Sequence, residues 1–103
     1  MDKVESKNKF NFKSKVTLYP GMGGWHFATI EKKIAEKIDR QFRMLRRGWN
    51  SLPVKVRIGE REWETSIFAD KKSGGYLLAI KAAIRRKEKI SEGSFVSVMI
   101  EIK

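Results

Sequence analysis

The fold is decided by the stretch Gly74-Gly75-Tyr76-Leu77-Leu78, which repeats in kind an earlier stretch, Gly23-Gly24-Trp25-His26-Phe27. Each has two glycines, an aromatic residue and the beginning of a strand, and a helix is predicted after each. Each helix leads through a Gly-containing loop into an alternating strand, Val54-Lys55-Val56 or Val96-Ser97-Val98. We therefore expect two strand–helix–strand halves, related by a pseudo-two-fold axis, that close a β-barrel without free sheet edges. The alternative explanation is the recurrence of simple turns in a Gly-rich β protein.

The rest of the sequence is also mainly β in character. Alternating apolar residues, or a concentration of β-branched and aromatic ones, predict strands over 10–19, 25–28, 54–58, 62–68, 76–80 and 95–102. Turns or loops are predicted at 20–24, 48–51, 59–61 and 70–75. The turn at 20–24 is Gly-rich, but it lacks the Lys-Ser/Thr pair and the following helix that a phosphate-binding loop requires.

Two segments predict helices, one long and one short. The long helix runs from Ile30 to Arg47, with Thr29 as its N-cap and Gly48 as its stop. Its apolar residues share about a third of a helical wheel and are assigned to the core: Ile34, Ile38, Phe42 and Leu45. The opposite side is basic: Lys33, Lys37, Arg40, Arg43 and Arg47. The short helix is predicted over 81–88, before a break at 91–93.

Length and composition indicate one domain. A chain of 103 residues with 11 aromatic residues can bury a single core. Residues 1–9 are polar and are predicted to form a flexible tail, leaving 10–103 as a single β-barrel domain. The absence of cysteine excludes disulfides and thiolate catalysis. No run of about 18 apolar residues and no signal sequence is present, so we expect a cytoplasmic protein without membrane insertion.

The charge is strongly basic and is concentrated in two blocks. Lysine and arginine number 23 against 12 acidic residues, for a net charge of +11. Residues 31–50 carry +4 and residues 71–90 carry +6. Such a field attracts polyanions but does not define specificity. The candidate anion or nucleic-acid contacts are the basic residues of these blocks and one tryptophan in the loop after the first: Arg40, Arg43, Arg46, Arg47, Trp49, Arg85, Arg86, Lys87 and Lys89.

Other chemistry-bearing residues favour structural roles. His26 is the single histidine, and no cysteine or spaced carboxylate accompanies it, so neither catalysis nor a metal site is indicated. Four aromatic residues within strands could stack on bases if exposed, but their alternation favours the core: Trp25, Trp63, Tyr76 and Phe95. We interpret the glutamates at 60, 62 and 64 as solvent-exposed side chains of the predicted hairpin. We expect no enzyme activity and no cofactor.

Several motifs together resemble the prokaryotic domain-of-unknown-function family DUF1905 over roughly residues 10–102. The motifs are Gly24-Trp25-His26-Phe27, Val54-x-Val56-x-Ile58, Trp63-x-Thr65-Ser66, Gly75-Tyr76-Leu77-Leu78-x-Ile80-Lys81, Ile84-Arg85 and Ile90-x-x-Gly93. The resemblance implies a double-split β-barrel, akin in architecture to AbrB- and MazE-like barrels, and implies no established activity. The chain departs from the family pattern at Glu31, where proline is frequent, and at Ser94, where aspartate is frequent.

Three functions follow as hypotheses. The first is a non-enzymatic binding module for an anionic polymer, DNA or RNA, with weak and salt-sensitive affinity. The second is a protein-interaction or assembly module that uses loops around Trp49 and the two Gly-Gly turns. The third is a small-anion binder. The sequence does not indicate an oligomeric state, nor whether the two basic blocks share one face.

Overall fold

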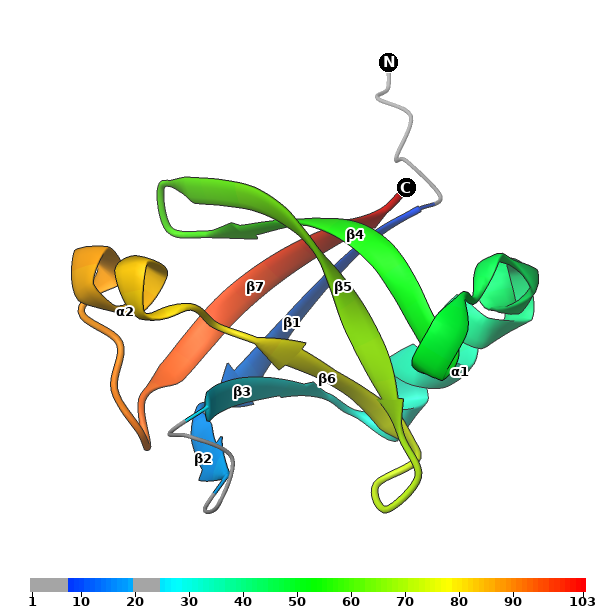
Figure 1. Ribbon diagram of the computed structural model, residues 1–103, viewed down its shortest axis with the longest axis horizontal. Coiled ribbons are helices and arrows are strands. Elements are labelled where there is room, and N and C mark those ends of the chain that lie inside the picture. The colour runs from blue at the N-terminus through cyan, green and yellow to red at the C-terminus, as the bar shows by residue number, and fades with distance from the viewer. Residues whose placement is uncertain (1–7, 20–24) are drawn as a thin grey trace.

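In the computed structural model, which describes residues 8–19 and 25–103, seven strands form one antiparallel sheet (Figure 1). The order across the sheet is β1-β7-β4-β5-β6-β3-β2. The strands are β1 (Lys9–Lys15), β2 (Thr17–Tyr19), β3 (Trp25–Ile30), β4 (Ser51–Ile58), β5 (Arg61–Asp70), β6 (Gly75–Ala79) and β7 (Phe95–Ile102). The predicted first strand is therefore divided at Val16, and the predicted turn at 20–24 lies outside the described residues.

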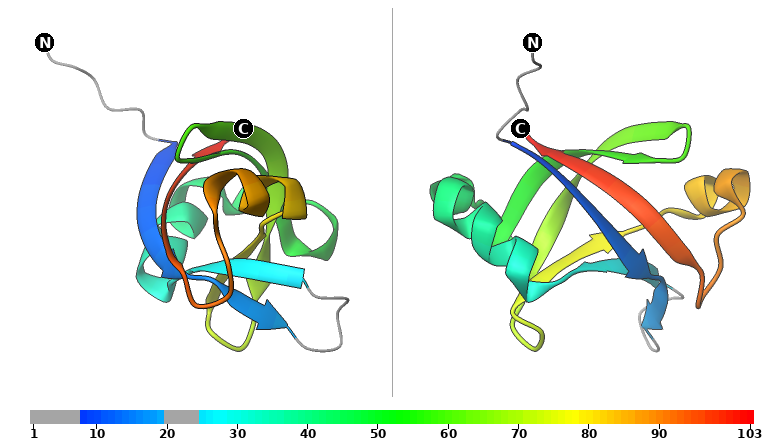
Figure 2. Two further views of the ribbon diagram at one scale, coloured as in Figure 1. Left: turned by 90° about the vertical axis from the view of Figure 1, so that its left-hand side faces the viewer. Right: turned by 180° about the vertical axis from the view of Figure 1, so that it is seen from behind.

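The sheet curls into a half-barrel, because its two edge strands are consecutive in the chain (Figure 2). Only Val16 separates β1 from β2, so one length of backbone pairs first with β7 and then with β3. The Val16 amide donates to the Ser94 carbonyl, and the Gly93 amide donates to the Val16 carbonyl, both at 2.8 Å. The Thr29 amide of β3 donates to Ser14 Oγ of β1 at 2.8 Å, which ties the two ends of the sheet together.

Helices lie at the two ends of the longest axis (Figure 1). At one end are α1 (Lys32–Phe42), the 3-10 turn η1 (Arg43–Leu45) and the 3-10 turn η2 (Gly48–Asn50). At the other end is α2 (Ala82–Glu88). Ala35 and Ile38 of α1 are buried, and Ile84 of α2 packs against the core. The structure thus confirms the predicted mainly β fold with one longer and one short helix.

The core is formed by the inward faces of the curled sheet. Alternate residues along β4 and β7 are buried, as expected for strands with one face in a core. The ring of Phe10 meets that of Phe42 edge-on at 6.3 Å, which joins β1 to the end of α1. The buried apolar residues of the strands, and of the link between β1 and β2, include Phe12, Val16, Phe27, Ala28, Ile30, Leu52, Val54, Val56, Ile58, Ile67, Tyr76, Leu78, Val96, Val98, Ile100 and Ile102.

The predicted bounds of the long helix are wrong at both ends. Thr29 and Ile30 belong to β3, where Ile30 lies opposite Tyr76 of β6, and the N-cap is Glu31. Strand pairing therefore outweighs the capping propensity of Thr29. After Phe42 the helix tightens into η1, and Arg46 is extended with φ −60° and ψ 140°. Leu45, predicted in the core, is 48% exposed for this reason.

The predicted burial of the strand aromatics is half correct. Tyr76 is 1% exposed, and Trp63 is half-buried against the core. Trp25 and Phe95 are instead 53% and 76% exposed. Each is the first residue of its strand and is paired on one side only, Trp25 with Tyr19 of β2 and Phe95 with Lys15 of β1. At the chain's start, Asn8 and Lys9 pair with β7, although the tail was predicted to extend through residue 9. The rest of that tail, residues 1–7, lies outside the described residues.

Candidate functional site

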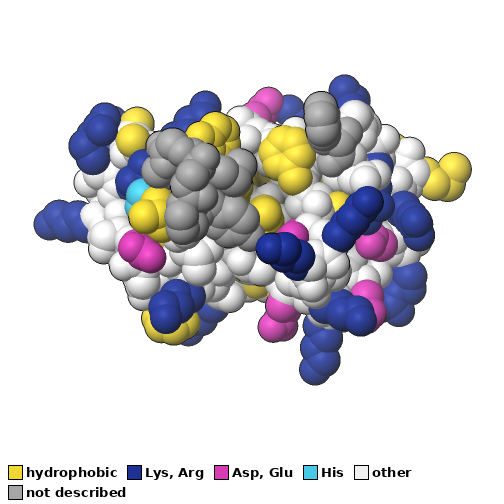
Figure 3. Space-filling model, turned by 60° about the horizontal axis from the view of Figure 1, so that its bottom comes forward, with side chains coloured by type: hydrophobic (Ala, Val, Ile, Leu, Met, Phe, Trp, Pro, Cys, Tyr) yellow, Lys and Arg dark blue, Asp and Glu magenta, His cyan; other side chains and the backbone are white. Residues whose placement is uncertain are grey.

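The two predicted basic clusters lie at opposite ends of the molecule, one with α1 and one with α2 (Figures 1 and 2). The molecule measures 39 Å along its longest axis. Seen from below, the lysine and arginine side chains are spread around the outline, with acidic side chains among them, and form no continuous stripe (Figure 3). The two clusters are therefore separate surfaces, each with its own surroundings.

At the α1 end, Arg46 is committed to the fold. Its Nη2 donates to Asp39 Oδ1 and Oδ2 at 3.0 and 3.1 Å, and its Nε donates to Tyr76 Oη at 3.0 Å. Tyr76 in turn donates to Asp39 Oδ1 at 2.5 Å. The side chain of Arg46 is only 19% exposed. Arg46, predicted as a polymer contact, thus holds the turn after α1 onto β6.

The electrostatics of this cluster match its structural role. Burial raises the pKa of Tyr76 to about 12, and the hydrogen bond to the Asp39 carboxylate acts in the same direction. Burial alone would lower the pKa of Arg46, but its contacts with Tyr76 and Asp39 outweigh this and raise it. Tyr76 is therefore a neutral donor and Arg46 a permanent cation at any physiological pH.

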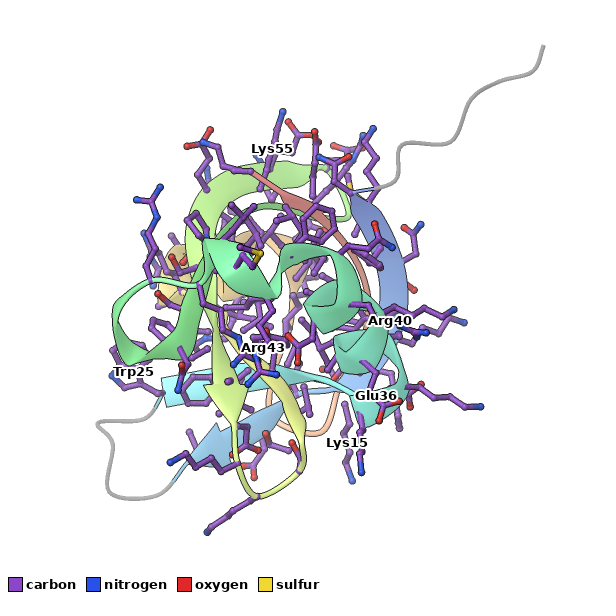
Figure 4. The ribbon with its side chains drawn as sticks, turned by 90° about the vertical axis from the view of Figure 1, so that its right-hand side faces the viewer. Lys15, Trp25, Glu36, Arg40, Arg43 and Lys55 are labelled. Atoms are coloured by element: carbon purple, nitrogen blue, oxygen red, sulfur yellow. The ribbon has the colours of Figure 1, made fainter. Side chains whose placement is uncertain are left out.

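The other cations of the α1 end are exposed but share their surroundings with carboxylates. Arg40 and Arg43 line a shallow hollow of about 380 Å³ together with Glu36 and Asp39. Figure 4 shows Arg40 and Glu36 next to each other on the outer side of α1. Arg47 is exposed, and its backbone bridges to Ser51. The Trp49 side chain lies outside the described residues, so its predicted role as an anchor stays a prediction.

The α2 end carries cations with fewer acidic neighbours. Four exposed cations lie in α2 or cap its two ends. Arg86 and Lys87 belong to the helix, Lys81 is its N-cap and Lys89 is its C-cap. None of the four forms an ion pair with another described residue. Glu88, the acid within α2, is 3.5 Å from Arg61 Nε of β5 and is directed at the β4–β5 turn beside Gly59. Arg61 thus neutralises the one negative charge of the helix.

A second hollow lies where β3 meets the residues leading into α2, and sequence reasoning missed it. Its volume is about 230 Å³. Trp25 and His26 of β3 line one side, and Ala79, Ile80, Lys81, Ala82 and Arg85 line the other. Arg85 is half-buried, and its Nε donates to the Ile80 carbonyl at 3.1 Å. The structure therefore brings Arg85, a predicted contact, together with Trp25 and Lys81, which were not predicted as contacts.

Other site classes find little support in the described part of the chain. Within residues 8–19 and 25–103, no group of three or more metal-ligating side chains is found. His26 lines the hollow, and the Ile80 amide donates to its carbonyl at 2.9 Å. In the same residues, no helix has the length and apolar character needed to cross a bilayer.

The geometry defines a small, basic, antiparallel half-barrel with a helix at each end and an aromatic-lined hollow at one of them. The chain belongs to the family described as Domain of unknown function (DUF1905), whose profile matches residues 12–100. This confirms the resemblance seen in the sequence motifs. A comparison with curated proteins finds no match.

Proposed function

We propose that this protein is a non-enzymatic binding module for an anionic polymer, DNA or RNA, and that the α2 end makes the contact. The observation that carries the proposal is the set of four exposed cations on and beside one short helix, with the single acid of that helix already paired to Arg61. Phosphates approaching this end meet positive charge without a competing carboxylate on the helix. The module would act in the cytoplasm, which the cysteine-free sequence allows.

The expected affinity is modest. Each lysine or arginine that neutralises a phosphate releases counterions, so binding weakens steeply as salt increases. With three or four such contacts we expect sequence-independent binding, with a dissociation constant of roughly 10⁻⁴ to 10⁻⁶ M at physiological salt. Nothing in this set of residues reads base edges, so we propose no sequence preference from charge alone.

The α1 end is the weaker candidate of the two. Arg46 is engaged by Asp39 and Tyr76, and Glu36 lies next to Arg40 and Arg43. Carboxylates within a few ångströms of the arginines reduce the local potential that a phosphate would meet. We therefore assign the α1 cations mainly to solvation of the helix surface.

We also propose that the half-barrel is built from two equivalent units, as in a double-split β-barrel. Two observations support this. The order strand, strand, helix, strand occurs twice, as β2-β3-α1-β4 and as β5-β6-α2-β7. The N-caps of the two helices, Glu31 and Lys81, have nearly the same backbone angles, φ −67° and ψ 162° against φ −65° and ψ 152°.

Charge reversal at each end tests the binding proposal. One variant carries Arg86→Glu, Lys87→Glu and Lys89→Glu, and the matched control carries Lys37→Glu, Arg40→Glu and Arg43→Glu. All six residues are exposed, and both variants lose the same amount of charge. Fluorescence anisotropy with labelled mixed-sequence oligonucleotides, titrated with salt, gives the affinity and the salt slope.

We expect the α2 variant to lose binding and to flatten the salt slope, with a much smaller loss in the α1 variant. Equal losses would show that only net charge matters, and no binding by the unmodified protein at low salt would refute the proposal. Circular dichroism confirms that each variant is folded.

A protein-interaction module is the second candidate function, and one observation favours it. Met44 is 97% exposed beside the half-exposed Leu45, which places an apolar turn at the α1 end. Single exposed apolar residues are common on protein surfaces, so this observation is weaker than the α2 charge. A protein captured from nuclease-treated lysate by the unmodified chain but lost with Met44→Asp would support this candidate over the first.

A further inference from the structure

The hollow beside α2 combines an exposed aromatic face with two cations. The indole of Trp25 stacks on the ring of Phe27, with centroids 6.0 Å apart and planes at 24°. That contact fixes the orientation of the indole, and Trp25 still remains 53% exposed. Lys81 and Arg85 line the other side, together with the small apolar residues Ala79 and Ala82.

The size and lining restrict what can occupy the hollow. At about 230 Å³ it is smaller than the roughly 300–1,000 Å³ of pockets that hold drug-sized ligands. A single planar ring with one attached anionic group matches this volume and this lining. A nucleobase with its phosphate has both properties, because the ring stacks on an aromatic face and the phosphate pairs with arginine or lysine.

The corresponding junction in the other half of the molecule is closed. There β6 meets the residues leading into α1, and Gly75 lies so close to Ile30 that a Cβ would overlap the Ile30 carbonyl oxygen. Tyr76, which follows it, is buried and hydrogen-bonded to Asp39 and Arg46. At the α2 junction the aromatic residue is exposed and the space beside it is open. The hollow is therefore a local feature of one junction rather than a by-product of the fold.

We infer that this hollow binds one nucleobase and its phosphate from a single-stranded nucleic acid, with the base stacked on Trp25 and the phosphate held by Arg85 and Lys81. The inference rests on the proposed function, since the cations of α2 attract the same polymer. It adds a preference that charge alone does not provide. Bases in a duplex are stacked and paired, so only an unpaired base can enter.

The first experiment compares single-stranded and duplex oligonucleotides of the same sequence by anisotropy at low salt. The unmodified protein binds the single strand more tightly. Trp25→Ala weakens single-strand binding by roughly 5- to 150-fold, the range that one stacked base supplies, and leaves duplex binding unchanged. Trp25→Phe retains a ring and recovers part of the loss.

The matched control is Phe95→Ala. Phe95 is exposed at the start of β7 but does not line the hollow, so its removal tests whether any exposed aromatic residue has the same effect. Arg85→Gln tests the phosphate contact and reduces the salt slope by about 1. Because Arg85 also donates to Ile80, thermal unfolding of this variant shows whether it is folded at the assay temperature.

The outcomes separate this inference from the proposed function. Equal affinity for single strand and duplex, or equal losses for Trp25→Ala and Phe95→Ala, overturns the nucleobase site and leaves the binding module standing. Absence of any polymer binding overturns both. Quenching of tryptophan fluorescence by a nucleoside monophosphate, abolished by Trp25→Phe and seen without polymer binding, assigns the hollow to a free nucleotide and refutes the single-strand site.

Discussion

Gly75→Ala should destabilise the protein strongly. Of the described glycines, only Gly75 and Gly48 lack a positive φ, and Gly75→Ala should cost far more stability than Gly48→Ala. Gly75 begins β6, opposite Asp70 of β5, and the next residue, Tyr76, lies opposite Ile30 of β3. A Cβ on Gly75 would overlap the Ile30 carbonyl oxygen and lie 3.1 Å from the Ile30 carbonyl carbon. These are backbone atoms, so rotation of a side chain cannot relieve the overlap.

The magnitude follows from what has to move. Overpacking a well-packed site costs about 1–3 kcal/mol. Separating β6 from β3 at this point also weakens ladder hydrogen bonds worth about 1 kcal/mol each. We expect the free energy of unfolding to fall by about 3 kcal/mol, which in a domain of this size lowers the melting temperature by roughly 12–24 °C.

Urea unfolding followed by circular dichroism and tryptophan fluorescence measures the change. The matched control is Gly48→Ala, because a Cβ on Gly48 would have no atom within 4 Å. We expect that control to stay within about 0.5 kcal/mol of the unmodified protein. A loss of less than about 1 kcal/mol in Gly75→Ala, or a loss equal to that of the control, would refute the close approach of β6 to β3.

Three further predictions concern polar contacts. Tyr76→Phe removes two hydrogen bonds to charged partners and should cost about 1.5–3 kcal/mol. Because folding raises the pKa of Tyr76 to about 12, the stabilisation that Tyr76 supplies is complete below pH 10 and is lost as pH rises towards 12. Denaturation of the unmodified protein and of Tyr76→Phe at pH 9 and pH 11 should therefore show that their difference in stability shrinks at the higher pH. Ser14→Ala leaves the Thr29 amide without its acceptor and should cost about 1–3 kcal/mol in urea unfolding, and an unchanged midpoint would argue against the closure between β1 and β3. Lys103 Nζ lies 2.6 Å from Glu64 Oε1 and lowers the pKa of Glu64, so Lys103→Ala should raise that pKa towards its ordinary value in an NMR titration without a measurable change in stability.

The strands were predictable from sequence because their side chains report the inside and outside of the sheet. Val54, Val56 and Ile58 alternate with charged residues, and the structure buries them as the pattern predicts. The start of α1 was not predictable in this way, since Thr29 and Ile30 suit a strand and a helix end equally. What decides their state is the pairing of Ile30 with Tyr76, which lies far along the chain.

The candidate site was predictable only in part. Local composition located both basic clusters, and it correctly identified α2 as basic. It did not show that the Arg46 side chain contacts Asp39, because that contact depends on the extended backbone of Arg46 at the end of η1. It also missed the hollow at Trp25, which exists because β3 lies beside β6 and Phe27 lies opposite Ala79. A single sequence does not state which strands are neighbours.

The pairing of β1 with β7 sets the order in which the chain can complete its fold. Lys9 lies opposite Glu101, so β1 has no partner on that side until β7 has been synthesised. The β4–β5 hairpin, with Ile58 opposite Arg61, requires only local residues and can form far earlier. Until β7 has been synthesised, a nascent chain therefore carries β1 without its partner strand, and the unpaired backbone of β1 is open to pairing with another molecule.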